Sequence, residues 1–174
     1  MALLPIITAP DPRLKLSCNP VERVDAGVRR LMDDLLETMY AAPGIGLAAP
    51  QVGVVERVLV VDIAKEGEDP APFRMANPVV LWRSDELASY DEGCLSLPDH
   101  YAPVTRPRHC RVRYLDHEDE IRELAAEGLL ATCIQHEIDH LDGILFVDHL
   151  SALKRGIILR KLQKAKKLKE AVSA

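Results

Sequence analysis

Hydrophobic residues recur with a helical period near the start of the chain. Between residues 24 and 40, the apolar positions that repeat at intervals of three and four are Val28, Leu31, Met32, Leu35, Leu36 and Met39. This spacing places them on one face of a helix. Pro43 and Gly44 follow, and together they predict the C-terminal end of that helix.

Short apolar runs in the middle of the chain predict β-strands. The runs with this pattern are residues 57–63, 75–82 and 110–116. The acidic turn at residues 117–120 predicts a hairpin from the third run to a partner that begins at Ile121. Residues 65–72 contain acidic residues and prolines, so we expect them to form an exposed loop between the first two strands.

A second helix is predicted from about Gly128 onward, and it is apolar on nearly every side. Its apolar residues are Leu129, Leu130, Cys133, Ile134, Ile138 and Leu141. A helix with this pattern is typical of the centre of a domain. Strands followed by such a helix indicate an α+β fold, in which mostly antiparallel sheets pack around the central helix.

The last part of the chain predicts a basic helix that begins after Ser151, a good N-cap residue. Its apolar stripe consists of Leu153, Ile157, Ile158, Leu162 and Leu168. Residues 151–174 carry eight basic side chains and one acidic one, a net charge of +7, whereas the whole chain carries −5 and residues 1–150 therefore −12. We expect a catalytic domain at 1–150, with 151–174 packed on it as a helix. Two interpretations stay open for its charge: a solvated helix on an acidic domain, or electrostatic docking to RNA.

Composition fits one catalytic domain, because 174 residues with 48% hydrophobic content can bury a sizeable core without disulfides. The first nine residues are not basic enough for a secretory signal, and their apolar part is too short. No stretch approaches the roughly 18 to 20 apolar residues of a membrane span. The four cysteines form no CxxC pair. We expect a monomer in the reducing cytoplasm, bound to neither membrane nor DNA.

Two histidines one helical turn apart are the strongest chemical signal in the chain. His136 and His140 point the same way from the predicted central helix, and Glu137 lies at the edge of the same face. Such a set can hold a divalent metal and activate a water molecule, which predicts metal-assisted hydrolysis. The alternative is a pair of ordinary histidines, but in so apolar a helix these side chains and Asp139 need partners.

A catalytic site of this kind usually takes a third protein ligand. Cys94 stands in the segment Asp91-Glu92-Gly93-Cys94-Leu95-Ser96-Leu97-Pro98. Gly93 frees the backbone before the thiol and Pro98 ends regular pairing, so we expect a strand to break here and to turn the thiol inward. A lone cysteine would otherwise be interpreted as a small buried hydrophobic residue.

Residues 44–51 form a glycine-rich segment that lacks the lysine and hydroxyl residue of a phosphate-binding loop. By itself it indicates tight packing. Together, however, three segments resemble the motifs of the peptide deformylases: residues 44–51, the sequence EGCLS at 92–96 and the sequence HEIDH at 136–140. The resemblance extends from the first helix to the basic C-terminal helix.

The resemblance implies a role for each matching residue. Cys94, His136 and His140 would be the metal ligands. Glu137 would be the general acid and base, and the oxyanion donors would be the Gln51 side chain and the Leu95 backbone N–H. The reaction would release formate from an N-formyl-methionyl peptide, with ferrous iron in the cell and zinc, nickel or cobalt as substitutes.

The substrate pocket follows from the same helix and the same resemblance. Leu129, Thr132 and Cys133 share the face of His136 and should wall an apolar pocket for a methionine side chain. The residues that the resemblance adds to the substrate site are Ile45, Gly46, Tyr90, Glu92 and Gly93. Ile45 and Gly46 could pair with the substrate backbone in the manner of a strand.

One departure and two alternatives remain. Tyr101 stands where many bacterial family members carry arginine, which leaves open how residues beyond the methionine are held. A metallopeptidase could use the same His-Glu-His chemistry, although Cys94 and Gln51 fit it poorly. A non-catalytic metal-binding protein that associates with ribosomes would keep the basic helix and would not need Glu137. The resemblance itself also implies ribosome contact through this helix.

Overall fold

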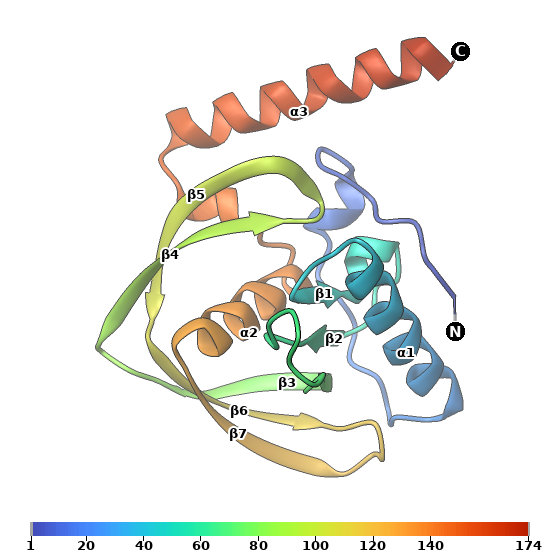
Figure 1. Ribbon diagram of the computed structural model, residues 1–174, viewed down its shortest axis with the longest axis vertical. Coiled ribbons are helices and arrows are strands. Elements are labelled where there is room, and N and C mark those ends of the chain that lie inside the picture. Colours follow the sequence, from blue (N-terminus) through green and yellow to red (C-terminus); the bar gives the residue numbers. More distant parts are fainter. Residues whose placement is uncertain (1, 174) are drawn as a thin grey trace.

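A five-stranded sheet and a two-stranded ribbon enclose a central helix, α2 (Gly128–Leu141) (Figure 1). The computed structural model describes residues 2–173. The strands are β1 (Gly46–Ala48), β2 (Val58–Val61), β3 (Phe73–Arg83), β4 (Leu87–Cys94), β5 (Leu97–Pro107), β6 (His109–Leu115) and β7 (Ile121–Glu127). The sheet has the order β1-β2-β3-β6-β7, β4 pairs with β5, and these pairings are antiparallel. The α+β prediction is confirmed.

The first predicted helix is α1 (Ala26–Ala41). The Asp25 side chain accepts a hydrogen bond from the Val28 N–H at 2.9 Å and so caps its N-terminus. After its last turn, the Gly44 N–H donates to the carbonyl of Met39 at 2.8 Å, which confirms the predicted end. The apolar face of α1 packs against β1 and β2.

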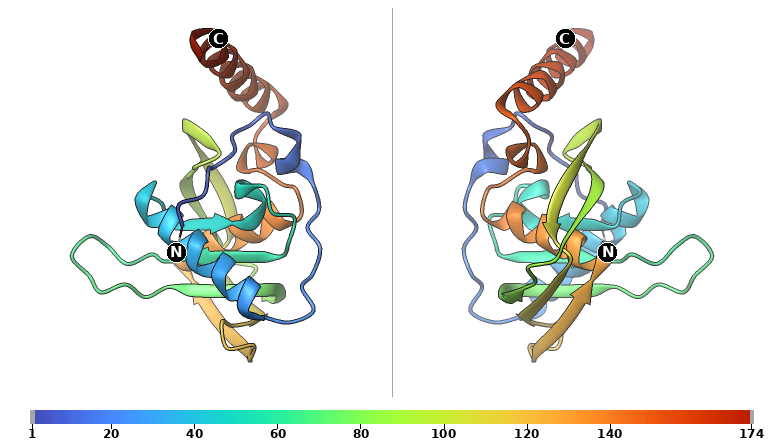
Figure 2. Two further views of the ribbon diagram at one scale, coloured as in Figure 1. Left: turned by 90° about the vertical axis from the view of Figure 1, so that its right-hand side faces the viewer. Right: turned by 90° about the vertical axis from the view of Figure 1, so that its left-hand side faces the viewer.

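The strand predictions for the large sheet are confirmed within a few residues. β2, β3 and β6 match the three apolar runs, and β7 begins at Ile121 as expected. In the turn between β6 and β7, Asp119 adopts a left-handed conformation with φ 63°. The loop at residues 65–72 projects from the body between β2 and β3 (Figure 2). Its predicted exposure is confirmed.

The β4–β5 ribbon was not predicted as a pair. β4 ends at Cys94, which confirms the expected strand break, but the prediction that Pro98 ends regular pairing is wrong because it lies inside β5. Leu97 pairs with Cys94, and the next pair joins Tyr101 to Gly93, so the register shifts between them. Pro98 therefore lies in a bulge, where no N–H is needed for the ladder.

The central helix α2 is buried as predicted. Ten of its 14 residues are buried, including both histidines and Glu137. Its apolar side packs against β1 and β2, and its opposite side approaches β4 and β5. Leu129 is an exception at 41% exposure, because it lies at the edge of a cavity.

The C-terminal helix is α3 (Ala152–Ser173), which lies across one end of the molecule (Figures 1 and 2). The Ser151 hydroxyl accepts from the Lys154 N–H at 3.3 Å and confirms the predicted cap. Of its described residues only Leu162 is buried, in a cluster with Phe146, while Leu168 is 59% exposed. Along residues 2–173, no helix is both long enough and apolar enough to cross a membrane.

Candidate metal centre and active-site pocket

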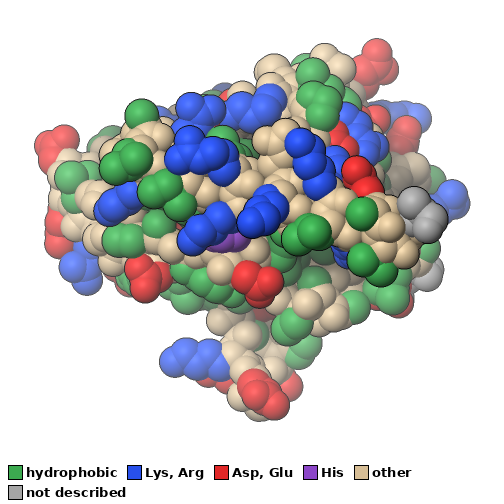
Figure 3. All heavy atoms as spheres, turned by 90° about the horizontal axis from the view of Figure 1, so that it is seen from above, with side chains coloured by type: hydrophobic (Ala, Val, Ile, Leu, Met, Phe, Trp, Pro, Cys, Tyr) green, Lys and Arg blue, Asp and Glu red, His purple; other side chains and the backbone are tan. Residues whose placement is uncertain are grey.

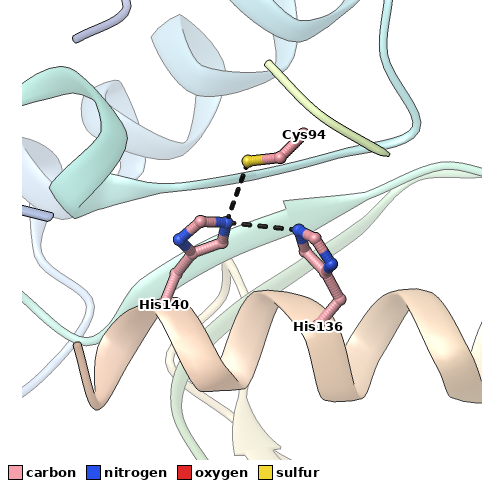
Figure 4. A group of neighbouring side chains, drawn as sticks. All are labelled: Cys94, His136 and His140. Atoms are coloured by element: carbon pink, nitrogen blue, oxygen red, sulfur yellow. Dashed lines mark hydrogen bonds between the residues drawn. The ribbon is translucent and has the colours of Figure 1, made fainter. Parts of the chain in front are cut away.

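Three potential ligand atoms converge between α2 and the end of β4. His136 and His140 lie one turn apart on α2, and their Nε2 atoms are 3.2 Å apart. Cys94 points toward them from β4, with its Sγ 3.3 Å from His140 Nε2 (Figure 4). The three ligand atoms lie within 4.8 Å of one another. The structure thus brings together the three residues that the sequence proposed as metal ligands.

The donor atoms of this cluster fit a divalent metal. Burial and the neighbouring His136 lower the pKa of His140 well below its usual value, so this imidazole is neutral. Burial alone would also lower the pKa of His136, but hydrogen bonds to Cys94 and Glu92 outweigh it and raise the pKa. Neutral His140 offers a nitrogen lone pair, and the proton that His136 holds in the metal-free cluster would leave when a divalent ion binds. One thiolate and two imidazoles suit zinc, iron and related ions.

Glu92 lies behind His136. Its Oε1 is 2.8 Å from His136 Nδ1, and Arg106 binds both of its oxygens, at 2.7 and 2.9 Å. Burial would raise the pKa of Glu92, but these hydrogen bonds lower it and keep the group ionised. A carboxylate on the outer nitrogen fixes the ring and leaves Nε2 directed at the ligand cluster.

Glu137 lies beside the cluster with one unpaired oxygen. Its Oε1 is 4.0 Å from His136 Nε2, and its Oε2 is buried with no hydrogen-bond partner among the described residues. The pKa of Glu137 is raised to about 7, because burial, together with the nearby charge of Glu92, outweighs the lowering effect of His136. Gly46 makes room for this side chain, since a Cβ at position 46 would lie 2.5 Å from Oε1.

The Gln51 side chain is fixed at both ends. The Ala48 N–H donates to Gln51 Oε1 at 2.9 Å, so its amide nitrogen must face the other way. Nε2 lies 3.1 Å from Ser96 Oγ and 3.4 Å from Cys94 Sγ. Gln51 therefore presents N–H groups beside the ligand cluster.

These residues open onto a cavity of about 880 Å³. Thirteen of the fourteen predicted site residues line it, and His140 lies beneath it at 1% exposure. The lining residues that were predicted are Ile45, Gly46, Gln51, Tyr90, Glu92, Gly93, Cys94, Leu95, Leu129, Thr132, Cys133, His136 and Glu137. Leu129, Thr132 and Cys133 share one wall of the cavity, as their spacing on α2 predicted.

The sequence did not reveal every residue at this site. Ile6, from the N-terminal segment, lines the cavity. Asp99 also lines it, from the irregular part of β5 between Leu97 and Tyr101. Arg106 was also missed, although it holds Glu92 in place. These residues belong to no local motif, and only the pairing of β4 with β5 brings Arg106 to Glu92.

Comparisons with known proteins agree with this geometry. A family model described as polypeptide deformylase matches residues 3–156. A peptide deformylase from Methylocella silvestris is 58% identical over 171 residues, which cover 97% of this chain and 87% of that protein. One from Rhizobium meliloti is 54% identical over 171 residues, covering 98% of both chains.

The solved structures give the same result. The crystal structure of peptide deformylase from Ehrlichia chaffeensis matches with a TM-score of 0.92 and 41% identity, covering 97% of this chain and 99% of that one. A structure of the deformylase of that organism in complex with actinonin matches with a TM-score of 0.91 and 43% identity, over 95% and 98% of the two chains. The chain therefore belongs to the polypeptide deformylase family.

Proposed function

We propose that the pocket beside Cys94, His136 and His140 is where this enzyme removes the formyl group from formyl-methionyl peptides. As a peptide deformylase, the chain acts on the N-formyl group of nascent peptides. The observation that supports the placement is the convergence of three ligand atoms next to a carboxylate with a free oxygen, at one wall of the cavity. Water adds to the formyl carbon, the C–N bond breaks, and formate and a free amine leave.

Cys94, His136 and His140 would hold one divalent ion. When bound, such an ion supplies a Lewis acid that lowers the pKa of water and polarises a carbonyl oxygen. We propose ferrous iron as the ion in the cell and zinc, nickel or cobalt as substitutes, since the donor set suits all of them. Because the thiol of Cys94 must stay reduced, this proposal also favours a reducing cytoplasm.

Glu137 moves the proton in this proposal. With a pKa of about 7, its carboxyl group can take a proton from the attacking water and return it to the departing amine nitrogen near neutral pH. Its unpaired Oε2 is free for the first step. Burial against Gly46 holds the group in place, so that it does not have to be ordered during the reaction.

Gln51 and Leu95 stabilise the oxyanion. The Nε2 of Gln51 faces the ligand cluster because Ala48 occupies its other end. Leu95 lies directly after Cys94 at the rim of the cavity, and its backbone N–H is the second proposed donor. Donors fixed before the charge develops are more effective than donors that must reorient.

The backbone of the substrate would pair with β1, which is an edge strand of the large sheet. The Ile45 carbonyl accepts from the Asp62 N–H at 2.9 Å and therefore faces β2. Because peptide groups alternate along an antiparallel strand, the N–H and C=O of Gly46 face the free edge. Gly46 thus offers the backbone partners of a substrate strand, while Leu129, Thr132 and Cys133 face its first side chain.

Formate release from an N-formyl-methionyl tripeptide tests the proposal. The protein should be purified without oxygen and loaded with ferrous iron, and the N-acetyl peptide serves as control. We expect formate from the first peptide and no cleavage of the second. Absence of formate with the metal bound would contradict the proposal, and cleavage of unformylated peptides would indicate a metallopeptidase.

We also propose that α3 contacts the ribosome. Lys and Arg side chains gather on the face of the molecule that carries α3 (Figure 3), and most of this helix is exposed. Charge-dependent binding to RNA would follow. Truncation after Gln163 keeps the buried Leu162, and it should weaken salt-dependent ribosome binding while sparing turnover of a short peptide. Unchanged binding would contradict this second proposal.

A further inference from the structure

A buried network of charges runs from Glu92, at the cavity, outward to the surface of the molecule. Its centre is Arg106 on β5, a guanidinium that is only 5% exposed. On one edge Arg106 binds Glu92, through Nε at 2.7 Å and Nη2 at 2.9 Å. On the other side its Nη1 donates to Asp139 on α2 at 2.8 Å. Arg106 thus joins a carboxylate of the ribbon to a carboxylate of the central helix.

The inner end of this network reaches a proposed metal ligand. Glu92 Oε1 pairs with Arg106 Nη2 and also lies 2.8 Å from His136 Nδ1. The direction of the Glu92 carboxylate, and with it the plane of the His136 ring, therefore depends on where the guanidinium lies. A guanidinium is planar, so one fixed edge constrains the other.

The outer end of the network reaches the surface. Asp139 Oδ2 accepts from Arg106 and also lies 2.8 Å from His149 Nε2. His149 is in the short helix η3 (Phe146–His149), next to the start of α3, and its side chain is 37% exposed. Neither Asp139 nor His149 lines the substrate cavity, so neither is placed to touch the peptide.

We propose that Asp139 and His149 are positioning residues of the metal centre, which act through Arg106 and Glu92 on the orientation of His136. Asp139 binds Nη1, the guanidinium nitrogen that Glu92 does not bind. His149 contacts the Asp139 carboxylate from the surface side. Without Asp139, the buried cation keeps one carboxylate partner and can turn about the axis of its side chain. This proposal rests on the metal site of the proposed function. If it holds, the wild-type protein loses its metal more slowly than variants that lack Asp139 or His149.

Metal retention tests the proposal without any peptide. Zinc-loaded protein is mixed with an excess of chelator, and the rate of zinc release is compared between wild type, Asp139→Asn and His149→Ala. Because partners of metal-bound histidines typically contribute 10- to 100-fold in metal affinity, we expect release about 10-fold faster for Asp139→Asn and about threefold faster for His149→Ala. If wild type binds no zinc, the metal site itself fails, which is a separate result.

Asp142→Asn is the matched control. Asp142 follows the same helix and forms a 2.8 Å ion pair with Arg57, but this pair does not include Arg106 or Glu92. Its release rate should equal that of wild type. Equal rates for wild type and for both Asp139→Asn and His149→Ala would overturn the proposal, and so would equally faster release from the control.

Two further measurements separate positioning from general stability. In the cobalt-substituted protein, the visible absorption reports ligand geometry, and it should shift in Asp139→Asn but not in Asp142→Asn. His149→Gln keeps an N–H donor for Asp139 and should restore slow release. If Asp139→Asn does not fold, the pair His149→Ala and His149→Gln decides the question, because His149 is partly exposed. An unshifted cobalt spectrum or no rescue by glutamine would contradict the proposal.

Discussion

The helices α2 and α3 both carry regularly spaced apolar residues, but the fold buries them to different extents. Ten of the 14 residues of α2 are buried, whereas Leu162 is the single buried residue described in α3. Two polar side chains of α2 have charged partners from distant segments, Glu92 for His136 and Arg106 for Asp139. The basic side chains of α3 mostly face outward.

This difference in burial indicates that α2 positions the reactive groups, whereas α3 is a peripheral helix attached to the domain. In α2, a displaced side chain would break contacts with several strands, so the helix can hold reactive groups to a fraction of an ångström. The contacts of α3 lie in its first half, where Ile158, Leu159 and Leu162 meet one hydrophobic cluster. Changes in α2 should therefore alter turnover, and changes in α3 should alter attachment or binding alone. The predictions below test this distinction.

The largest effect should follow the loss of the Glu137 carboxylate. Glu137→Gln keeps the size of the side chain but cannot carry the proton, so kcat should fall by about 100- to 10,000-fold. Formate release measures kcat, and elemental analysis measures the bound metal, which should be unchanged. Loss of the metal together with activity would mean that Glu137 supports the ligands instead of the proton transfer.

A pair of glycine substitutions should distinguish the two regions. In Gly46→Ala the new methyl group would lie 2.5 Å from Glu137 Oε1 and must displace it, so we expect kcat/KM to fall by about 100-fold, as for other small misplacements of catalytic groups. In Gly156→Ala the nearest atom is Arg160 Nη1 at 3.6 Å, in a helix interior. That variant should keep its activity and stabilise α3 by about 0.5–1 kcal/mol. Equal activities of the two variants would contradict the placement of Glu137.

Truncation of one buried residue in each helix should compare their attachment. Ile134 of α2 is 0% exposed, and Ile134→Ala should lower the free energy of unfolding by about 2–5 kcal/mol. Leu162→Ala removes a similar volume from α3, but this helix can detach while the rest stays folded. We expect a smaller loss in chemical denaturation and faster tryptic cleavage within α3. Equal losses would show that α3 unfolds together with the core.

The smallest effect should be a pH-dependent one at the base of α3. Burial would raise the pKa of Asp148, but hydrogen bonds from Lys15 and the Leu145 N–H outweigh it and lower the pKa, and Arg155 of α3 lies 2.9 Å away. A lowered pKa stabilises the fold above the unfolded value of about 3.8, and this contribution disappears as the pH falls through the folded value.

Asp148→Asn should therefore cost about 1–2 kcal/mol at pH 7 and less at pH 3, which lies below the unfolded value. Thermal unfolding of wild type and variant across this range measures the difference. Asp69→Asn, in the exposed loop, is the control and should match wild type at both pH values. A constant difference between wild type and Asp148→Asn would show that shape matters at position 148 and charge does not.

The sequence predicted the elements whose side chains follow a regular period. The 3.6-residue pattern identified α1 and α2, and the apolar runs identified β2, β3 and β6. The β4–β5 ribbon escaped because β4 contains no continuous apolar run and Glu92 is its only buried residue. Its bulge at Pro98 also depends on a register that only the folded pair defines.

The site shows the same limit. The ligand set and Glu137 could be predicted because the helical period and short motifs carry them. Arg106 and His149 could not, since Arg106 is 14 residues from Glu92 and 33 from Asp139 along the chain. Tertiary packing brings such partners together, and their contacts cannot be predicted from local patterns in one sequence. The same holds for the distance between Gly46 and Glu137, which no local pattern reveals.

The hydrogen bond from the Ala48 N–H to Gln51 has a consequence for the energetics of turnover. An amide side chain in solution samples two orientations, and choosing one costs conformational entropy. Here the backbone of β1 makes that choice when the chain folds, so the orientation is settled long before a peptide arrives. If Gln51 is the oxyanion donor that we propose, substrate binding does not have to order its side chain, because the amide already points toward the ligand cluster.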